Sequence, residues 1–562
     1  MKKGPSASGA AGRSFRAGRD FMSSKLLRGT FILTLGTIIS KILGVFYVIP
    51  FDAIIGGSGP EALYQFGYVP YNIFISISTA GVPLAVAKYV AKYNALEEYA
   101  VSRKLFRSSM YLMIVTGIAG FLVMYVFAPY FTDLAMAGKQ EAQVFSKADV
   151  TVVIRAVSFA LIIIPVMSLI RGFFQGHQSM GPSAVSQVVE QVVRILFMLI
   201  GAYVILHMLH GSIVSAISAA TFAAFVGGMA SLFVLIWYWF KRKPHLDRLL
   251  EQDKGTMHVS IPTLYKEIIL SALPFVFVGI ANSLYQMVDQ LTVKRGMEAV
   301  GLGKMWQTQL GILNFQSHKL VIIPVSLATA FSMTLVPMIT EAFAKRERDM
   351  LVRSVDQTLQ VLLFITVPAA LGMSLLAKPI FAIFYNTDNA VSVSVLMHYA
   401  PVAILFSLYS VTAAIMQGIN EQRWTILSLL VGLLLKLSLN IPLIKMFGIL
   451  GAVYATAIGY TASILISFIV IKLFAAYPYR TVIRRTILIL IFNAVMLAVT
   501  GAVYKGLTLV LSPSSRWQAL LIVTICAAAG AVVYAYLGLK SKLADKLFGV
   551  RIQRVKARLH MR

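Results

Sequence analysis

Long apolar stretches separated by short polar connections run through almost the whole chain. Each is long enough to cross a bilayer as a helix, because about 20 apolar residues suffice. We place these stretches near residues 27–49, 66–90, 106–128, 150–170, 184–206, 213–239, 267–291, 312–340, 355–376, 393–416, 425–445, 449–473, 484–505 and 516–537. The pattern therefore predicts an all-α polytopic membrane protein with about 14 transmembrane helices.

The composition agrees with this pattern. Of the 562 residues, 58% are hydrophobic and only 13% are charged, about half the charged fraction of a soluble protein. The net charge of +28 comes from Lys and Arg gathered in alternate connections and at both ends. Because basic residues mark the cytoplasmic side, we expect a multi-pass membrane protein with both termini cytoplasmic. The same residues predict contact with anionic membrane lipids rather than with nucleic acid.

The two halves of the chain resemble each other. Gln175-Gly176 is repeated as Gln417-Gly418, and Arg194 and Lys436 follow at the same distance. FAPYF around Pro129 likewise matches AKPIF around Pro379. Halves repeated in the same orientation are typical of one class of transporter. The repeat predicts two six-helix lobes followed by two additional helices.

These features predict six segments. In order, they are a disordered basic cytoplasmic tail (1–24), an N-lobe with helices 1–6 (25–240), a cytoplasmic inter-lobe linker (241–266), a C-lobe with helices 7–12 (267–475), helices 13–14 (476–540) and a basic cytoplasmic tail (541–562).

Cationic side chains interrupt several of the apolar stretches. Lys41 lies near the middle of the first stretch, and Lys319 follows Gln316, Ser317 and His318 in the eighth. Ionisable residues inside a membrane usually face a polar cavity or a partner. Two alternatives stay open: a snorkelling Lys41, and a Lys319 in interfacial water at the outer end of its stretch. Pro324 is expected to break or bend that helix.

Acidic residues are fewer at this depth. Glu190 and Arg194 are four residues apart on one helix face, so a mutually neutralised structural pair is an alternative to a binding role. Asp289 lies near the outer end of the seventh stretch. The deep cations outnumber these acids, and excess positive charge suits phosphate or pyrophosphate. The predicted substrate-binding residues are Lys41, Lys319, Arg194, Glu190 and Asp289.

Signatures of enzyme chemistry are missing from the sequence. There is no GxxxxGK[ST] loop, no HExxH motif and no Cys/His cluster with zinc spacing. Cys526 is the single cysteine, and we expect it to be a buried structural thiol. The outer acids and histidines, at Asp52, Glu61, His207 and His210, are too scattered to indicate a polyprenyl-phosphate enzyme. We therefore expect a transporter without cofactor or metal.

Three segments carry a family resemblance: KLLRGTFILTLGTIISKILGVFYVIPF, VPYNIFISISTAGVPLAVAKYVAKYN and RGFFQGHQSMGPSAVSQVVEQ. They resemble the polysaccharide-export branch of the MOP superfamily. Within that branch the chain is similar to the Gram-positive MurJ-type lipid II flippases and to the stage V sporulation protein B group. The resemblance extends from about residue 25 to residue 540.

The resemblance implies two six-helix lobes in a V and two helices that form a lipid-holding groove. It also implies alternating access that moves an undecaprenyl-pyrophosphate-linked sugar between leaflets, with cell-wall synthesis proteins as possible partners. Lys41 and Lys319 match arginines that are essential in Gram-negative relatives. The chain departs from those relatives near Tyr47, where a further arginine is replaced, and in VPYNIFISIS, which lacks the arginines of their second helix.

Some relatives bind sodium between helices seven, eleven and twelve. The matching positions here are Lys436, Asn440 and Thr456. We hypothesise that the Lys436 ammonium takes the place of that ion.

The leading function is thus a flippase for lipid-linked peptidoglycan precursor. An exporter of another lipid-linked oligosaccharide, for spore cortex, capsule or a teichoic-type polymer, is the main alternative. A multidrug exporter of the MATE branch is less favoured, because cation extrusion requires central carboxylates. A membrane enzyme acting on polyprenyl phosphates is least favoured.

Overall fold

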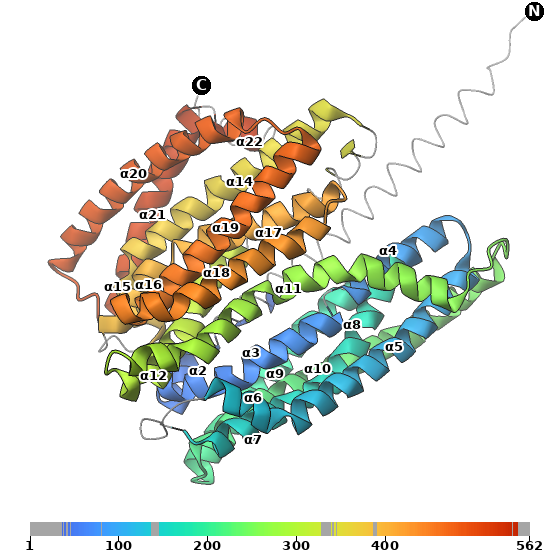
Figure 1. The fold of residues 1–562 in the computed structure, drawn as a ribbon, viewed down its shortest axis with the longest axis horizontal. Coiled ribbons are helices and arrows are strands. Elements are labelled where there is room, and N and C mark those ends of the chain that lie inside the picture. Colours follow the sequence, from blue (N-terminus) through green and yellow to red (C-terminus); the bar gives the residue numbers. More distant parts are fainter. Residues whose placement is uncertain are drawn as a thin grey trace, which may run out of the picture.

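The computed structural model describes residues 36, 39–40, 43–44, 47–79, 81–136, 145–326, 339, 342–343, 346–385, 390–541 and 543–548. Lys41 and both predicted tails, apart from residues 541 and 543–548, lie outside this part of the chain. Every regular element within it is a helix (Figure 1). This agrees with the expected all-α architecture.

The first half of the chain contains two short helices and several long ones. In order they are α2 (Val48–Ile55), α3 (Ser58–Thr79), α4 (Val82–Ala95), α5 (Tyr99–Val126), α6 (Ala128–Ala135), α7 (Lys147–Ser158), α8 (Ala160–Gly176), α9 (Met180–Tyr203), the π-helix η2 (Val204–Met208), α10 (Ile213–Glu251) and α11 (Ile261–Glu298).

The second half follows a similar course. Its elements are η3 (Gly303–Met305), α12 (Trp306–Gly311), the π-helix η4 (Ile312–Ser317), α14 (Arg348–Leu375), α15 (Ala377–Phe384), α16 (Ala390–Tyr399), α17 (Val402–Gly418), α18 (Arg423–Phe447), α19 (Leu450–Ala475), α20 (Arg480–Thr508), α21 (Arg516–Lys540) and α22 (Leu543–Phe548).

Ten helical segments in the described residues are long and apolar enough to cross a membrane. Each coincides with one of the predicted stretches. The stretch predicted at 267–291 lies within α11, whereas 27–49 and 312–340 are described only in part. The chain is therefore a multi-pass helical membrane protein, and the total of fourteen spans stays a prediction.

The prediction of one helix over 66–90 was wrong. α3 ends at Thr79 and α4 begins at Val82. Gly81 lies against α11, where a Cβ would come within 2.3 Å of the Ala272 carbonyl oxygen. Pro83 then occupies the first turn of α4, a position that proline favours. The missing side chain of Gly81 thus lets the start of the new helix contact α11.

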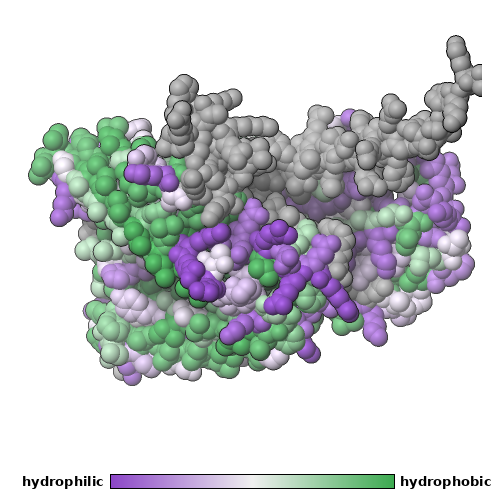
Figure 2. Space-filling model, turned by 90° about the horizontal axis from the view of Figure 1, so that it is seen from above, coloured by the Kyte–Doolittle hydropathy of each residue, from purple (hydrophilic) through white to green (hydrophobic). Residues whose placement is uncertain are grey.

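The helices form two groups, with α11 between them. Figure 1 shows the blue to green helices α3 to α10 on one side and the yellow to red helices α14 to α21 on the other. α11 packs against α3 and α4 of the first group and against α18 of the second. Figure 2 shows broad hydrophobic surface on the left of the face drawn there, and hydrophilic residues gathered toward its middle and right.

Helix lengths repeat between the two groups. α5 and α14 are both 28 residues long, α6 and α15 are both 8, and α8 and α17 are both 17. Gln175-Gly176 ends α8 and Gln417-Gly418 ends α17. The repeated Gln-Gly pair thus occupies the same place in equivalent helices of the two halves.

The predicted linker at 241–266 is mostly helical, which corrects the expectation of a long polar connection. α10 continues to Glu251 and α11 begins at Ile261, so the connection is 252–260. Lys254 pairs with Glu97 at 2.9 Å, and Thr256 donates its backbone N–H and its hydroxyl to Glu98. These hydrogen bonds lower the pKa of Glu98. They hold the connection against the turn between α4 and α5.

Small residues bring α18 and α19 into close contact. A Cβ on Gly432 would lie 2.2 Å from Ser463 Oγ and 2.4 Å from the Tyr285 hydroxyl, and Gly459 faces Gly432 across the interface. Close approach at small residues is a common way for membrane helices to associate. Tyr285 belongs to α11, so this contact joins three helices.

We expect Gly432→Ala to destabilise the protein by about 1–3 kcal/mol, because the added methyl group overpacks this contact. Thermal unfolding of the purified protein in detergent measures the change. Gly372→Ala in α14 is the matched control, since no atom lies within 4 Å of its Cβ position. Equal unfolding midpoints for the two variants would contradict the assigned packing.

Candidate functional site

A fully buried charged pair connects α11 and α18. Lys436 Nζ donates to Asp289 Oδ2 at 2.8 Å and to Thr456 Oγ1 of α19 at 2.6 Å. Lys436 is 0% exposed and Asp289 is 3% exposed. The ammonium also lies 5.6 Å from the centroid of the Tyr285 ring. Oxygen atoms and an aromatic face therefore replace the water that this charge would bind in solution.

Asn440 extends the network by one helical turn. Its Nδ2 donates to Asp289 Oδ1 at 3.1 Å and to Thr292 Oγ1 at 2.6 Å. The structure thus brings Lys436, Asn440 and Thr456 together, as the predicted ion-site region requires. Asp289 was assigned to the substrate-binding residues, and the structure instead places it in this network.

Lys319 lies directly after an irregular stretch of helix. The π-helix η4 ends at Ser317, and π-helical turns are frequent at functional sites. The Lys319 ammonium is 5.5 Å from the Tyr47 ring centroid and 5.7 Å from that of Phe315. No carboxylate of the described residues forms an ion pair with it. Its positive charge is therefore held by aromatic faces and stays available to an anion.

The neighbouring His318 is fixed at both ring nitrogens. Nε2 lies 2.9 Å from Asn282 Nδ2, and Nδ1 lies 3.0 Å from the Tyr399 hydroxyl. The helix is not interrupted at Pro324, since it is helical to residue 326. The irregularity that precedes Lys319 is the π-helix, which sequence analysis did not predict.

Arg194, in α9 of the first group of helices, also lies near Tyr47. It donates to the Tyr68 hydroxyl at 3.0 Å and to Gln191 Oε1 at 2.6 Å, while its Nε has no partner among the described residues. Tyr68 stacks on Tyr64, with ring centroids 4.9 Å apart. Tyr47 lies close enough to Arg194 to interact with it electrostatically. Lys319 and Arg194 thus both lie near Tyr47, whereas Lys41 lies outside the described residues.

Glu190 is not paired with Arg194 as the alternative reading of the sequence had it. It accepts a hydrogen bond from Arg171 at 2.8 Å, and Arg171 also donates to Ser186 and Ser231. Arg171 lies inside α8 and binds side chains of α9 and α10. Ser186 and Glu190 are four residues apart, so they share one face of α9. This polar face in an apolar helix is the feature of the sequence that could have indicated a buried basic partner.

Sequence analysis also did not predict that Glu61 is buried and that Asp52 is half-buried. Asp52 in α2 and Glu61 in α3 were assigned to an outer connection, yet Glu61 is 0% exposed. The two acids lie in different helices and come together only because of the turn that joins them. Their spacing in the sequence therefore matches no recognisable motif.

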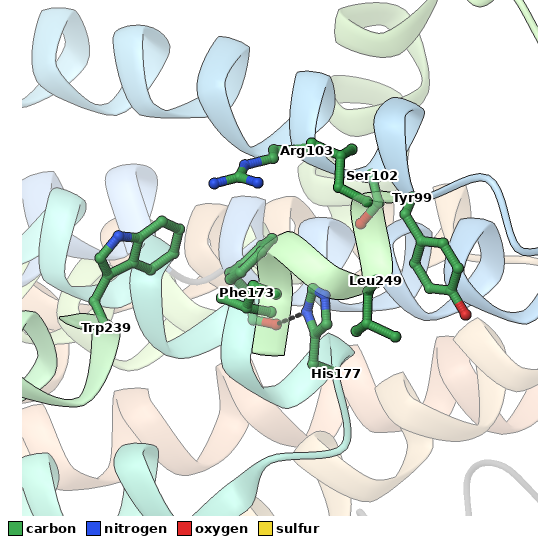
Figure 3. Close-up of a pocket in the computed structure, with 9 residues that line it drawn as sticks. Tyr99, Ser102, Arg103, Phe173, His177, Trp239 and Leu249 are labelled. Atoms are coloured by element: carbon green, nitrogen blue, oxygen red, sulfur yellow. Dashed lines mark hydrogen bonds between the residues drawn. The ribbon is translucent and has the colours of Figure 1, made fainter. Parts of the chain in front are cut away.

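A small pocket between α5, α8 and α10 is filled mainly by aromatic side chains (Figure 3). Phe173 contacts both Trp239 and His177, with ring centroids 5.4 Å and 4.3 Å away, and His177 Nδ1 bonds the Phe173 carbonyl. Arg103 at its edge pairs with Asp247. This pocket is part of the packing near the basic connections, away from Lys319 and Arg194.

The fold is similar to that of solved transporters of the MOP superfamily. The structure matches the inward closed conformation of the lipid II flippase MurJ with a TM-score of 0.63 and 14% identity, over 92% of this chain and 99% of that one. It matches an inward-facing multidrug resistance MATE transporter with a TM-score of 0.61 and 15% identity, over 78% of this chain and 94% of that one.

Sequence comparison identifies the family. Residues 26–343 match the family model described as polysaccharide biosynthesis protein, and the chain belongs to this family. Lipid II flippase MurJ of Bacillus subtilis is 45% identical over 94% of this chain and 98% of its own length. Stage V sporulation protein B of the same organism is 24% identical over 77% of this chain and 81% of its own length.

Removing one member of the buried pair leaves the other charge without a partner. We expect Lys436→Met or Asp289→Asn alone to destabilise the protein by about 3–5 kcal/mol, and the double variant to be more stable than either single one. Thermal unfolding of the purified variants measures both effects.

The exposed pair Lys147–Asp133 is the matched control. Lys147→Met is expected to change the free energy of unfolding by about 1 kcal/mol or less. A buried pair that behaves like this exposed one, or strictly additive single effects, would show that Lys436 and Asp289 do not depend on each other.

Proposed function

We propose that this protein moves lipid II, the undecaprenyl-pyrophosphate-linked peptidoglycan precursor, from the inner to the outer leaflet of the bacterial plasma membrane. The observation that carries the proposal is the 45% identity to the lipid II flippase of Bacillus subtilis over nearly the full length of both chains. The protein acts as a transporter by alternating access, and it is not an enzyme.

The chemistry of the substrate fits the two unpaired cations. A pyrophosphate carries several negative oxygens that basic side chains bind through charge-assisted hydrogen bonds. Lys319 and Arg194 converge on Tyr47 from the two groups of helices, and Lys41 of the first span adds a third cation. Arginine contributes a fork of donors and lysine a single mobile ammonium. The headgroup therefore binds between the groups while the polyprenyl tail stays in lipid.

The architecture we propose has fourteen spans in two parallel six-helix lobes. The N-lobe covers 25–240, the C-lobe 267–475, and helices at 476–540 form a groove for the lipid tail. The equal lengths of α5 and α14 and of α8 and α17 support this repeat. Both termini face the cytoplasm, where the basic connections meet anionic lipids.

The Lys436 network bears on how transport is powered. Its ammonium lies among Asp289, Thr456 and the ring of Tyr285, surroundings that also suit a small cation. We propose that Lys436 supplies permanently the charge that sodium supplies in some relatives. Transport then depends on the membrane potential or on another ion.

An exporter of a different lipid-linked oligosaccharide is the second candidate. The similarity to stage V sporulation protein B favours it, and the same cations would bind the shared pyrophosphate. Cell-wall synthesis proteins are the partners expected in either case.

Complementation tests the function. In a host depleted of its own lipid II flippase, we expect the wild-type chain to restore growth, and Lys319→Ala to fail although it reaches the membrane. The loss of a charge-assisted hydrogen bond, about 1.5–3 kcal/mol, weakens substrate binding by about 10- to 100-fold.

Lys319→Arg is expected to restore growth, because it keeps the positive charge. Lys304→Ala serves as the control, since Lys304 is exposed. Rescue by Lys319→Ala would remove this residue from the binding site. Full expression without rescue by the wild type would favour the second candidate.

The Lys436 assignment makes a separate prediction. Replacing sodium by choline at constant ionic strength is expected to leave lipid II transport by reconstituted wild-type protein unchanged. A several-fold stimulation by sodium would refute the substitution of ion by ammonium.

A further inference from the structure

A buried and a half-buried acidic side chain lie together at the junction of α2 and α3. Gly56 and Gly57 form the turn between these helices with φ values of +83° and +102°, conformations that glycine adopts without strain. The turn brings Asp52 of α2 next to Glu61 in the first turn of α3, and the two interact electrostatically. Glu61 is 0% exposed and is shielded from water, whereas Asp52 is half-buried.

The oxygen atoms of this pair lack donors. Neither carboxylate oxygen of Glu61 has a hydrogen-bond partner among the described residues, nor has Oδ1 of Asp52. Gln316 of η4 faces Glu61 and is 4% exposed, and its side-chain oxygen is also unpartnered. Two carboxyl groups and an amide therefore meet here, and these oxygen atoms have no hydrogen-bond donor among the described residues. Burying such groups without partners is costly, and two adjacent carboxylates cannot both ionise cheaply.

The other charged or titratable neighbours do not neutralise both acids. Tyr385, directly after α15, lies near Glu61 and Asp52, and its hydroxyl hydrogen points to the Gln316 carbonyl. Arg516, at the start of α21, attracts Asp52 but is exposed. Tyr47 lies close to Tyr385 and faces Lys319. One bound proton would remove the charge repulsion between the acids and supply the missing donor, because a protonated Glu61 can donate a hydrogen bond to Asp52 or Gln316.

The pair also lies where the two groups of helices close on each other. Gln65, one turn after Glu61, donates to the Asn314 carbonyl of η4 at 2.8 Å, and Gln290 of α11 donates to the Gln65 carbonyl at 2.8 Å. Phe315 packs on Tyr64, with centroids 5.7 Å apart. By the predicted topology this is the outer end of the helices. Opening that side separates α3 from η4 and exposes Glu61 to the outer medium.

We propose that Asp52 and Glu61 form a proton-binding site that holds one proton while the outer side is closed and releases it when that side opens. The charge of the pair changes from −1 to −2 on opening, and the proton passes to water. This proposal rests on the alternating access of the proposed function, but not on the identity of the lipid. It gives protons a place in the transport cycle that the Lys436 network does not provide.

The sign of the pH dependence follows from linkage. Because the closed state binds one proton more, acid stabilises it and alkali favours opening. The ratio of open to closed protein rises by up to about tenfold per pH unit, within the window between the pKa values of the two states.

The test measures the distance across the outer side as a function of pH. Cys526, the single cysteine, is replaced by alanine, and spin labels are attached at Leu134→Cys and Leu302→Cys, both exposed positions in the native chain. The full chain in lipid nanodiscs is examined between pH 5.5 and 8.5 without any lipid-linked sugar. We expect the long-distance population to increase with pH.

Variants separate Glu61 from other titrating groups. Glu61→Gln mimics the protonated acid and is expected to stay closed at every pH, whereas Glu61→Asp keeps a pH dependence with a shifted midpoint. Asp149→Asn, at an acid in the α7 capping box on the same side, is the control and leaves the wild-type curve unchanged. A Glu61→Gln curve with the wild-type pH dependence would overturn the proposal.

A second measurement covers the case in which Glu61→Gln does not close normally. The infrared band of a protonated, buried carboxylic acid is expected in the wild type and is lost in Glu61→Gln. Its persistence in that variant would overturn the proposal, as would opening controlled by sodium concentration rather than by pH. Neither readout uses lipid II, so failure of the complementation experiment leaves this test intact.

Discussion

The structure depends on one constraint, that a charge buried among membrane helices must have a partner of opposite charge or a set of dipoles. Lys436 and Asp289 meet it completely, with Thr456 and Asn440 filling the remaining hydrogen-bonding positions. Since α11 packs against α3 and α4 as well as against α18, this pair anchors a helix that contacts both groups. Replacing both charges by well-packed apolar residues is expected to be close to neutral for stability, so stability alone does not explain the pair, and the coupling role proposed above would.

The way in which each charge is satisfied separates structural groups from binding groups. Arg171 donates to one acid and two hydroxyls, so its hydrogen bonds hold α8 to α9 and α10. Lys319 instead rests on the rings of Tyr47 and Phe315, and Arg194 on a tyrosine hydroxyl and a glutamine. Aromatic faces stabilise a cation without neutralising it. These two cations therefore keep a net charge that an anionic headgroup can use, which formal charge counting along the sequence could not distinguish.

Sequence reasoning predicted the helices well, because membrane-spanning length and composition are local properties. It also grouped Lys436, Asn440 and Thr456, whose roles followed from a family resemblance. It offered a pair between Glu190 and Arg194 as an alternative to a binding role, because helical spacing identifies only Arg194. The packing of α8 on α9 instead brings Arg171 to Glu190. Glu61 was missed for a similar reason: an acid in a short connection looks solvated, and its burial comes from η4 and α15, more than 200 residues away. Tertiary contacts of this kind leave no periodic signal.

The position of η4 provides a physical route between the acid pair and the substrate cations. Gln316 faces Glu61, and Lys319 follows three residues later in the same stretch of helix. Both side chains belong to one continuous stretch of helix, so movement of η4 relative to α3 would displace them together. Tyr47 lies near Lys319 and also near Tyr385 beside the acids. In the mechanism we propose, proton release at Glu61 and reorientation of the headgroup site are then consequences of one displacement, and the lobes need no separate signal to connect them.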